Sequence, residues 1–165
     1  MAAIVTVAGG CGWTFDDSDR LDSILEQTER KARVLLVEDD DEMRSLLKSI
    51  LRADGYVVVE AATGREGVTY IYDAWGVGGR SARPLDLIVS DIRMPGWGGL
   101  DLLDVVRRAK MDTPVLLITA FGAPETHQEA TRLGAGAVLD KPFALDEFRT
   151  TVALMLQRGP AGCGL

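Results

Sequence analysis

The sequence is poor in cysteine, in histidine and in long hydrophobic runs. Its 165 residues include two cysteines, Cys11 and Cys163, which lie near opposite ends of the chain. They form neither a disulfide framework nor the paired spacing of a zinc site. No apolar run approaches the roughly 18 residues that a membrane span needs, and residues 2–8 lack the preceding basic residues of a signal peptide. These absences predict a cytoplasmic protein with no membrane partner.

Positive charge is also in deficit. The chain has 18 Lys and Arg residues against 25 Asp and Glu residues, which gives a formal net charge of -7. Such a charge repels nucleic-acid phosphates and anionic lipids, so it speaks against nucleic acid or a membrane surface as the main partner. Hydrophobic residues make up 47% of the chain, enough for the core of one ordinary globular domain.

Short apolar runs alternate with stretches of helical spacing between residues 33 and 156. The apolar runs predict strands at residues 34–37, 56–59, 85–90, 115–119 and 137–140. Between and after them, apolar residues recur at helical spacing, as in the set Val68, Ile71, Tyr72 and Trp75. The alternation predicts an α/β fold, with a doubly wound five-stranded parallel sheet and five helices.

The start of the second predicted helix carries a local signal of its own. Thr63 stands three residues before Glu66, which is the spacing of a capping box. We therefore expect a helix to begin directly after Thr63.

Two end segments lie outside the alternation. Residues 1–31 form an acidic N-terminal extension, which is either a tail or a short helix whose apolar edge, with Leu21, Ile24 and Leu25, docks on the domain. Residues 158–165 are glycine-rich and predict a flexible C-terminal tail. The domain itself is expected at residues 32–157, and neither end is long enough for an effector domain.

Acidic side chains follow two of the predicted strands. Glu38 and Asp39 come after the first strand, and Asp91 comes after the third. Because these strands can be neighbours in a parallel sheet, we expect the three carboxylates to share one crevice at its carboxyl edge. Their mutual repulsion would raise their pKa values unless a cation neutralises it, and oxygen ligands suit Mg²⁺. The sequence therefore predicts a magnesium site.

A hydroxyl and an ammonium group follow the other strands. Thr119 ends the fourth predicted strand, and Lys141 follows the fifth. Either residue alone is ordinary for a strand end or a surface. Beside Asp91 they would supply a hydrogen-bond donor and a counter-ion to a nucleophilic carboxylate. Formation of an acyl phosphate requires such a set.

Four strings carry a family resemblance: VLLVEDD at residues 34–40, DLIVSDIRMPG at 86–96, LLITA at 116–120 and DKPF at 140–143. In order and spacing they resemble the receiver domain of two-component response regulators, which has a flavodoxin-like fold. The resemblance covers about three quarters of the chain.

The resemblance implies a role for each acidic residue. Asp91 is the phosphoacceptor. Glu38, Asp39, Asp91 and the backbone carbonyl of Arg93 hold Mg²⁺. The phosphoryl donor is a sensor histidine kinase or a histidine phosphotransfer protein. The chain is then no enzyme beyond its own phosphorylation and dephosphorylation, and it controls a downstream protein that the sequence does not name.

The resemblance also covers the basic and hydroxyl residues. It makes Thr119 the switch hydroxyl and Lys141 the contact to the phosphoryl group, with a cis bond from Lys141 to Pro142. His127 is the only histidine in the chain, and it falls on the polar fourth helix. We expect His127 at the surface, away from the crevice, so the reactive histidine must come from the partner.

Two positions bear on switching. Three residues before Lys141, where the family usually has an aromatic residue that moves with the hydroxyl, this chain has Val138. Val138 is small and stiff, which puts the usual coupling in doubt. Phe121, two residues after Thr119, either screens the phosphoryl group from water and slows its loss or simply packs.

The sequence leaves other functions open. The preferred prediction is a stand-alone, single-domain response regulator that changes a protein-interaction surface and is a possible homodimer. One alternative is a receiver-like module that binds proteins without phosphorylation, and another is a hydrolase that acts on external substrates. Labelling by a small acyl phosphate and the presence of turnover would separate the three.

Overall fold

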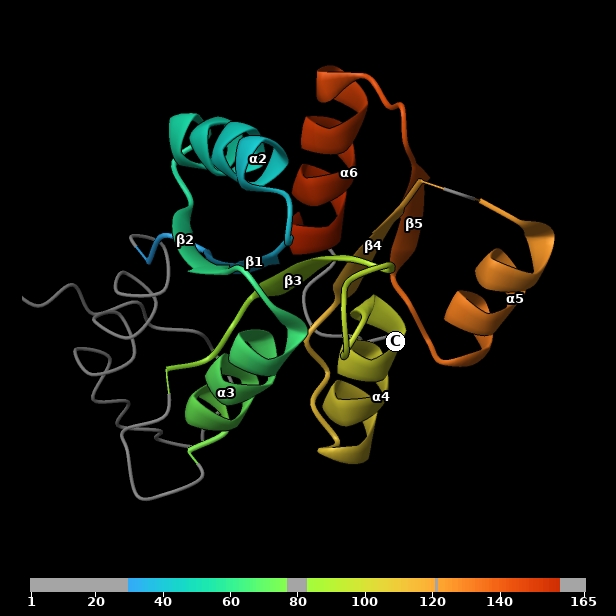
Figure 1. Ribbon diagram of the computed structural model, residues 1–165. Coiled ribbons are helices and arrows are strands. Elements are labelled where there is room, and N and C mark those ends of the chain that lie inside the picture. Colours follow the sequence, from blue (N-terminus) through green and yellow to red (C-terminus); the bar gives the residue numbers. More distant parts are fainter. Residues whose placement is uncertain (1–29, 77–82, 121, 158–165) are drawn as a thin grey trace, which may run out of the picture. The chain divides into compact units, whose positions relative to one another are not determined.

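The computed structural model describes residues 30–76, 83–120 and 122–157, and the described residues from Lys31 onward belong to one compact unit. Strands and helices alternate along them (Figure 1). The strands are β1 (Arg33–Val37), β2 (Val57–Ala61), β3 (Leu87–Asp91), β4 (Val115–Thr119) and β5 (Ala137–Asp140). The helices are α2 (Asp41–Ala53), α3 (Gly64–Ala74), α4 (Gly99–Arg108), α5 (Pro124–Arg132) and α6 (Leu145–Gln157).

The five strands form one parallel sheet in the order β2-β1-β3-β4-β5. This order makes β1 and β3 neighbours, as the sequence predicts. It also confirms the doubly wound sheet with five helices in the described ranges. The predicted tail at residues 158–165 and most of the predicted extension at residues 1–31 lie outside the described residues.

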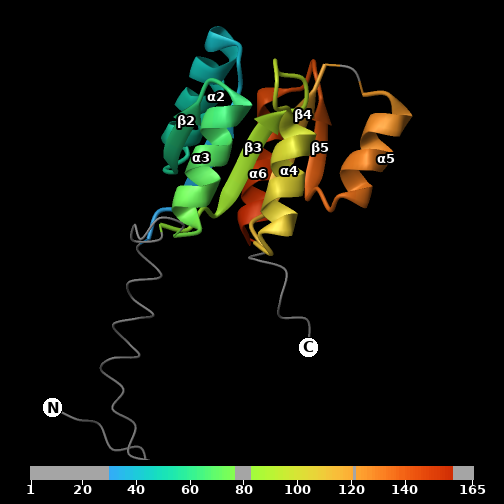
Figure 2. The ribbon, with the colours of Figure 1, turned by 60° about the horizontal axis from the view of Figure 1, so that its bottom comes forward.

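Helices cover both faces of the sheet, which explains why its strands read as continuous apolar runs. Leu35 and Val37 of β1 pack on one side, in a core shared with α3, α4 and α5. Val34 and Leu36 pack on the other side, against α2 and α6. Figure 2 shows α3 and α4 in front of the strands. Full burial of each such side chain stabilises the fold by about 1.5–3 kcal/mol.

Side chains fix where α2 and α3 begin. The Asp40 carboxylate accepts a hydrogen bond from the backbone amide of Met43 at 2.7 Å and so caps α2. The Thr63 hydroxyl accepts a hydrogen bond from the amide of Glu66 at 3.2 Å. The Glu66 carboxylate accepts from the amide of Ala62 at 2.9 Å, not from that of Thr63. The predicted helix start is therefore confirmed, although the return bond is shifted by one residue.

Three strands differ from their predicted bounds because pairing decides where they begin and end. The strand predicted at residues 34–37 is β1, which begins at Arg33 because Arg33 pairs with Val57. The strand predicted at residues 56–59 is β2, which extends to Ala61 because Ala61 pairs with Val37. The strand predicted at residues 85–90 is β3, which includes Asp91 because Asp91 pairs with Ile118. Apolar patterning reports burial, and it does not show how far a neighbouring strand extends.

The apolar face of α3 is narrower than its periodicity suggests. Ile71 is fully buried, but Tyr72 is 40% exposed and Trp75 is 49% exposed. These two rings stack on each other, with centroids 6.4 Å apart. The apolar residues of α3 therefore extend beyond the core onto the surface at the C-terminal end of the helix.

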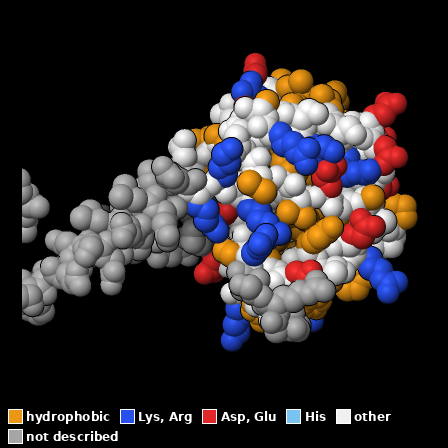
Figure 3. All heavy atoms as spheres, turned by 90° about the vertical axis from the view of Figure 1, so that its left-hand side faces the viewer, with side chains coloured by type: hydrophobic (Ala, Val, Ile, Leu, Met, Phe, Trp, Pro, Cys, Tyr) orange, Lys and Arg blue, Asp and Glu red, His pale blue; other side chains and the backbone are white. Residues whose placement is uncertain are grey.

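Basic side chains gather beside the β2 edge of the sheet. Lys48 and Arg52 of α2 both pair with Glu60 of β2, at 2.9 and 3.8 Å. Figure 3 shows this side of the molecule, with Lys and Arg groups around hydrophobic side chains. Part of the positive charge of the described residues is thus located at this edge.

A search of the described residues finds no helix with the length and apolar character needed to cross a bilayer.

Candidate functional site

Strand register gathers the candidate site at the carboxyl edge of the sheet. Val37 of β1 is level with Ser90 of β3, so the next residues, Glu38 and Asp91, lie at the same edge. Across the sheet, Thr119 of β4 is level with Asp140 of β5. The site therefore draws on four segments that are far apart in the sequence.

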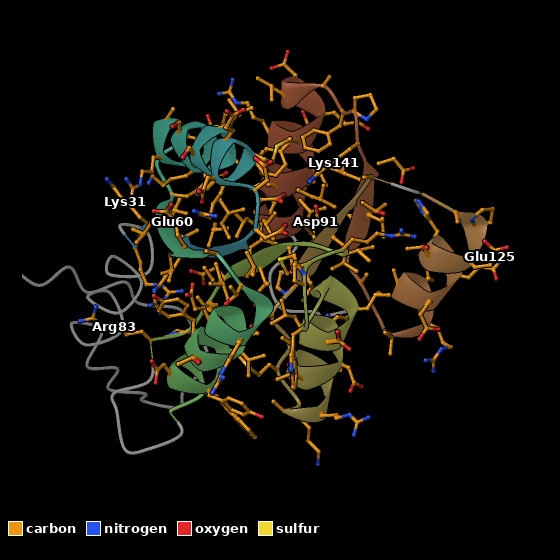
Figure 4. All side chains as sticks on the ribbon, viewed as in Figure 1. Lys31, Glu60, Arg83, Asp91, Glu125 and Lys141 are labelled. Atoms are coloured by element: carbon orange, nitrogen blue, oxygen red, sulfur yellow. The ribbon has the colours of Figure 1, made fainter. Side chains whose placement is uncertain are left out.

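Lys141 lies between the two buried carboxylates. Its ammonium nitrogen donates to Asp91 Oδ2 at 2.5 Å and to Glu38 Oε2 at 3.0 Å. Figure 4 shows the side chains of Lys141 and Asp91 close together at the centre of the molecule. The backbone amide of Lys141 donates to the carbonyl of Thr119 at 2.7 Å, and the bond to Pro142 is cis, as expected.

Burial and charge set the protonation of these groups. Glu38 is 1% exposed and Asp91 is 6% exposed. Burial raises the pKa of Glu38, although the hydrogen bond from Lys141 offsets part of this increase. Burial lowers the pKa of Lys141, but its bonds to Asp91 and Glu38 outweigh that effect, so the net shift is upward. Lys141 is thus a cation at neutral pH, held against two carboxyl groups.

Asp91 is held from a second direction by its own loop. Its other oxygen, Oδ1, accepts a hydrogen bond from the backbone amide of Arg93 at 2.7 Å. Both carboxylate oxygens therefore have donors, which fixes the orientation of the group. Thr119, at the end of β4, is fully buried.

The structure assigns different positions to the four consecutive acids after β1. Glu38 alone turns inward to Lys141. Asp39 is exposed, Asp40 caps α2, and Asp41 pairs with Arg44. The described ranges contain no group of three His, Cys, Asp or Glu side chains placed to hold a metal ion. A part for Asp39 in metal binding therefore stays a prediction.

The donor set of the site nevertheless suits Mg²⁺. This ion usually takes only one or two protein carboxylates and keeps several waters. Glu38 and Asp91 supply two carboxylates that contact the same ammonium nitrogen, so a single cation already bridges them. The backbone amide of Arg93 donates to Asp91, so the Arg93 backbone lies beside the same carboxylate.

His127 contacts a side chain of β5. It is partly exposed on α5, and its Nε2 lies 2.9 Å from Asp140 Oδ1, directly before Lys141 in the chain. Gly122 packs on the same carboxylate, since a Cβ atom added there would lie 2.0 Å from Asp140 Oδ1. No sequence signal linked these residues. Phe121 and its predicted effect on phosphoryl loss lie outside the described residues.

A shallow groove that the sequence did not predict lies beside Lys141. It has a volume of about 450 Å³, and its lining residues are Asp40, Glu42, Met43, Leu46 and Lys141. Leu46 is 43% exposed, although it lies on α2 directly before the fully buried Leu47. The spacing of apolar residues along this helix does not show that Leu46 reaches the rim of the site.

Comparison with known proteins identifies the family. The response regulator receiver domain matches residues 34–153, which include β2 to β5, all of β1 except Arg33, and most of α6. The chain belongs to the response regulator receiver family. Receiver domains of two-component systems are phosphorylated, and they generally use Mg²⁺ in that reaction.

Curated relatives of this receiver are longer proteins. The chain is 35% identical over 128 residues to the transcriptional regulatory protein TcrA of Mycobacterium tuberculosis, covering 78% of this chain and 47% of TcrA. It is 31% identical over 128 residues to the response regulator RppA of Synechocystis, covering 78% of this chain and 52% of RppA. The chain thus spans about half the length of these relatives.

Solved receiver structures share the fold. Chemotaxis protein CheY4 of Vibrio cholerae is 31% identical, with a TM-score of 0.63 over 78% of this chain and 98% of CheY4. A CheY-like receiver domain protein from Methanospirillum hungatei is 25% identical, with a TM-score of 0.69 over 78% of this chain and 96% of that chain. These matches confirm the predicted receiver fold.

Proposed function

We propose that this receiver accepts a phosphoryl group on Asp91 from a phosphohistidine of a sensor histidine kinase or a histidine phosphotransfer protein. The observation that carries the proposal is the contact of Lys141 with both buried carboxylates, Asp91 and Glu38, at the carboxyl edge of the sheet. A lysine held there is a fixed positive charge beside the carboxylate that would receive the phosphoryl group.

The proposed reaction is an in-line displacement at phosphorus. A carboxylate oxygen of Asp91 forms the new bond to phosphorus while the bond from phosphorus to the partner's imidazole nitrogen breaks. The electron pair of the broken bond remains on that nitrogen, and the other ring nitrogen keeps its proton. No electron is gained or lost, and no further reactant is needed.

Each site residue has a proposed part in this step. Lys141, which contacts the carboxylates of Asp91 and Glu38, would also contact the phosphoryl oxygens and offset their negative charge. Thr119 donates its hydroxyl to the phosphoryl group. Glu38, Asp39, Asp91 and the Arg93 carbonyl would hold Mg²⁺, which when bound neutralises charge on the transferring group.

Phosphorylation is proposed to change the surface formed by α5, β5 and α6, where a downstream protein binds. The observations that support a movable surface are the single buried residue of α5, Ala130, and the side-chain contact of His127 with Asp140. Val138 is half-buried in β5 and offers no ring to couple Thr119 to this surface. The domain bounds 32–157, a stand-alone role, a homodimer and a cytoplasmic location stay predictions.

Small phosphodonors test the proposal. Phosphoramidate with Mg²⁺ should add one phosphoryl group per chain, measured by intact mass, and a chelator should abolish the addition. Asp91→Asn should remain unlabelled while it unfolds cooperatively like the parent. Absence of labelling in the parent would favour a binding module that works without phosphorylation. Consumption of more than one donor molecule per chain, where slow loss of the phosphoryl group from the labelled chain does not account for it, would favour a hydrolase.

A further inference from the structure

Trp97 is a large apolar side chain left on the surface beside the candidate site. It is 49% exposed, and it belongs to the loop that joins Asp91 at the end of β3 to α4. A single exposed apolar residue is ordinary by itself. The position and the rigidity of this one set it apart from the others.

Three glycines hold the loop of Trp97 in place. A Cβ atom on Gly64 would lie 2.0 Å from the Trp97 carbonyl oxygen, and one on Gly98 would lie 2.3 Å from the Ile92 carbonyl oxygen. One on Gly99 would lie 2.6 Å from the Asp91 carbonyl oxygen. The backbone on both sides of Trp97 thus packs directly on other backbone, at distances that only glycine permits.

Hydrogen bonds close the same loop. The Gly99 amide donates to the Ile92 carbonyl at 3.2 Å, and the Gly98 amide donates to the Asp101 carboxylate at 2.9 Å. The loop therefore returns to the end of β3 just before α4 begins. An indole on such a fixed loop loses little conformational entropy when a partner covers it, which favours binding.

The loop lies where any protein donor must approach. Asp91 is only 6% exposed, so a phosphohistidine has to enter the site from the carboxyl edge of the sheet. Trp97 is at that edge, because its carbonyl touches Gly64, the first residue of α3 after β2. A donor protein whose histidine reaches Asp91 consequently covers this part of the rim.

We propose that Trp97 anchors the phosphohistidine-bearing donor protein, in an apolar pocket next to the reactive histidine of that protein. The inference rests on the proposed phosphorylation of Asp91 and adds the residue that binds the donor. Tryptophan is enriched among the few residues that carry most of the binding energy of an interface. Trp97 touches no reacting atom, so small phosphodonors should not sense it.

The chain contains a matched control for this residue. Trp75 is also 49% exposed, but it caps the C-terminal end of α3. Since α3 has 11 residues, its two ends lie about 16 Å apart, which places Trp75 away from the edge where Asp91 lies. Replacing Trp75 therefore removes an equally exposed indole without touching the rim of the site.

The test compares a protein donor with a small donor. A panel of autophosphorylated sensor kinases is screened against the parent chain, and the fastest donor is used for Trp97→Ala, Trp97→Phe and Trp75→Ala. Trp97→Ala should lower the second-order rate constant of transfer by about 10- to 100-fold, as loss of an anchor residue does. Trp97→Phe should recover part of the loss, and Trp75→Ala should match the parent. Phosphoramidate labelling should stay within about twofold in all three, as expected when the reacting groups are unchanged.

Three results would overturn the inference. Trp97→Ala could transfer as fast as the parent, which would leave the phosphorylation of Asp91 standing without this anchor. It could lose phosphoramidate labelling as well, which would mean that Trp97 supports the site itself and not the donor. A panel in which no kinase labels the parent, although phosphoramidate does, would remove the protein donor and with it the anchor.

Discussion

Lys141 is the residue that contacts both buried carboxylates of the site. It is the cation that contacts both Glu38 and Asp91, and both acids are nearly fully buried. Lys141→Ala would leave two neighbouring carboxyl groups without that partner. We expect a loss of about 1–3 kcal/mol in the free energy of unfolding, measured with urea in the presence of a chelator. Lys110→Ala, which removes an exposed lysine outside the site, should change it by less than about 0.5 kcal/mol.

Burial of Glu38 makes the stability of the protein depend on pH. Its pKa is raised in the folded protein, mainly by burial, so the folded state binds the proton more strongly than the unfolded state. The stability that this proton confers is present below the ordinary pKa of 4.5 and is lost as the pH rises through the raised value. Glutamine does not titrate in this range, so Glu38→Gln does not show this loss of stability.

Unfolding of the parent and of Glu38→Gln in urea, from pH 4 to pH 7 with a chelator, tests this sign. The stability of the variant relative to the parent should increase as the pH rises. A relative stability that falls toward neutral pH would contradict the account, because it would mean that ionised Glu38 stabilises the fold.

The run of four acids shows what the sequence could not resolve. The sequence places four acids directly after the first predicted strand. Because they are consecutive and chemically similar, the sequence does not show which of them faces the site. Asp40 caps α2, and Glu38 contacts Lys141. Which acid faces inward depends on the path of the backbone after the strand, and apolar patterning carries no information on that path.

Among the described helices, α5 buries the fewest residues against the rest of the domain. Its sequence is polar, and Ala130 is its one buried residue. The contact of His127 with Asp140 ties it to β5. Both side chains are substantially exposed, so His127→Ala should cost less than about 1 kcal/mol in global stability. Local opening of the helix should nevertheless increase.

Hydrogen exchange read by mass spectrometry can detect that opening. Peptides from α5 should exchange faster in His127→Ala than in the parent, whereas peptides from α4 should not change. Asp140→Asn should have the same local effect. Unchanged exchange in α5 would show that the pair does not hold the helix.

The sequence predicted the bounds of some strands better than those of others. The strands β4 and β5 have the predicted bounds, because Pro114 and glycines punctuate them and both are apolar throughout their buried part. The bounds of β2 and β3 depend on pairing with β1 and β4. The contact between α5 and β5 joins polar side chains far apart in the chain, and no periodic pattern encodes it.

Binding of a metal ion to the site would be linked to folding. If Mg²⁺ binds among Glu38, Asp91 and the Arg93 carbonyl, it stabilises only the folded chain. At a concentration 100 times the dissociation constant, the gain is about 2.7 kcal/mol. The thermal midpoint of the parent should therefore rise with Mg²⁺ relative to a chelator at the same ionic strength.

Two variants give this measurement its control. Asp91→Asn removes one of the carboxylates and should lose most of the rise. Asp112→Asn alters an exposed acid next to β4, at the end where that strand begins, and should keep the full rise. An equal rise in all three chains would mean that the ion binds elsewhere or acts through general screening.

Phosphorylation of Asp91 is tested by locating the phosphoryl group on the chain. After labelling with phosphoramidate and Mg²⁺, borohydride converts an aspartyl phosphate into homoserine, which peptide mass spectrometry can place. Homoserine should appear at position 91 alone. Homoserine at Asp39 or Asp40, or at no position in a chain that is properly folded, would contradict this prediction.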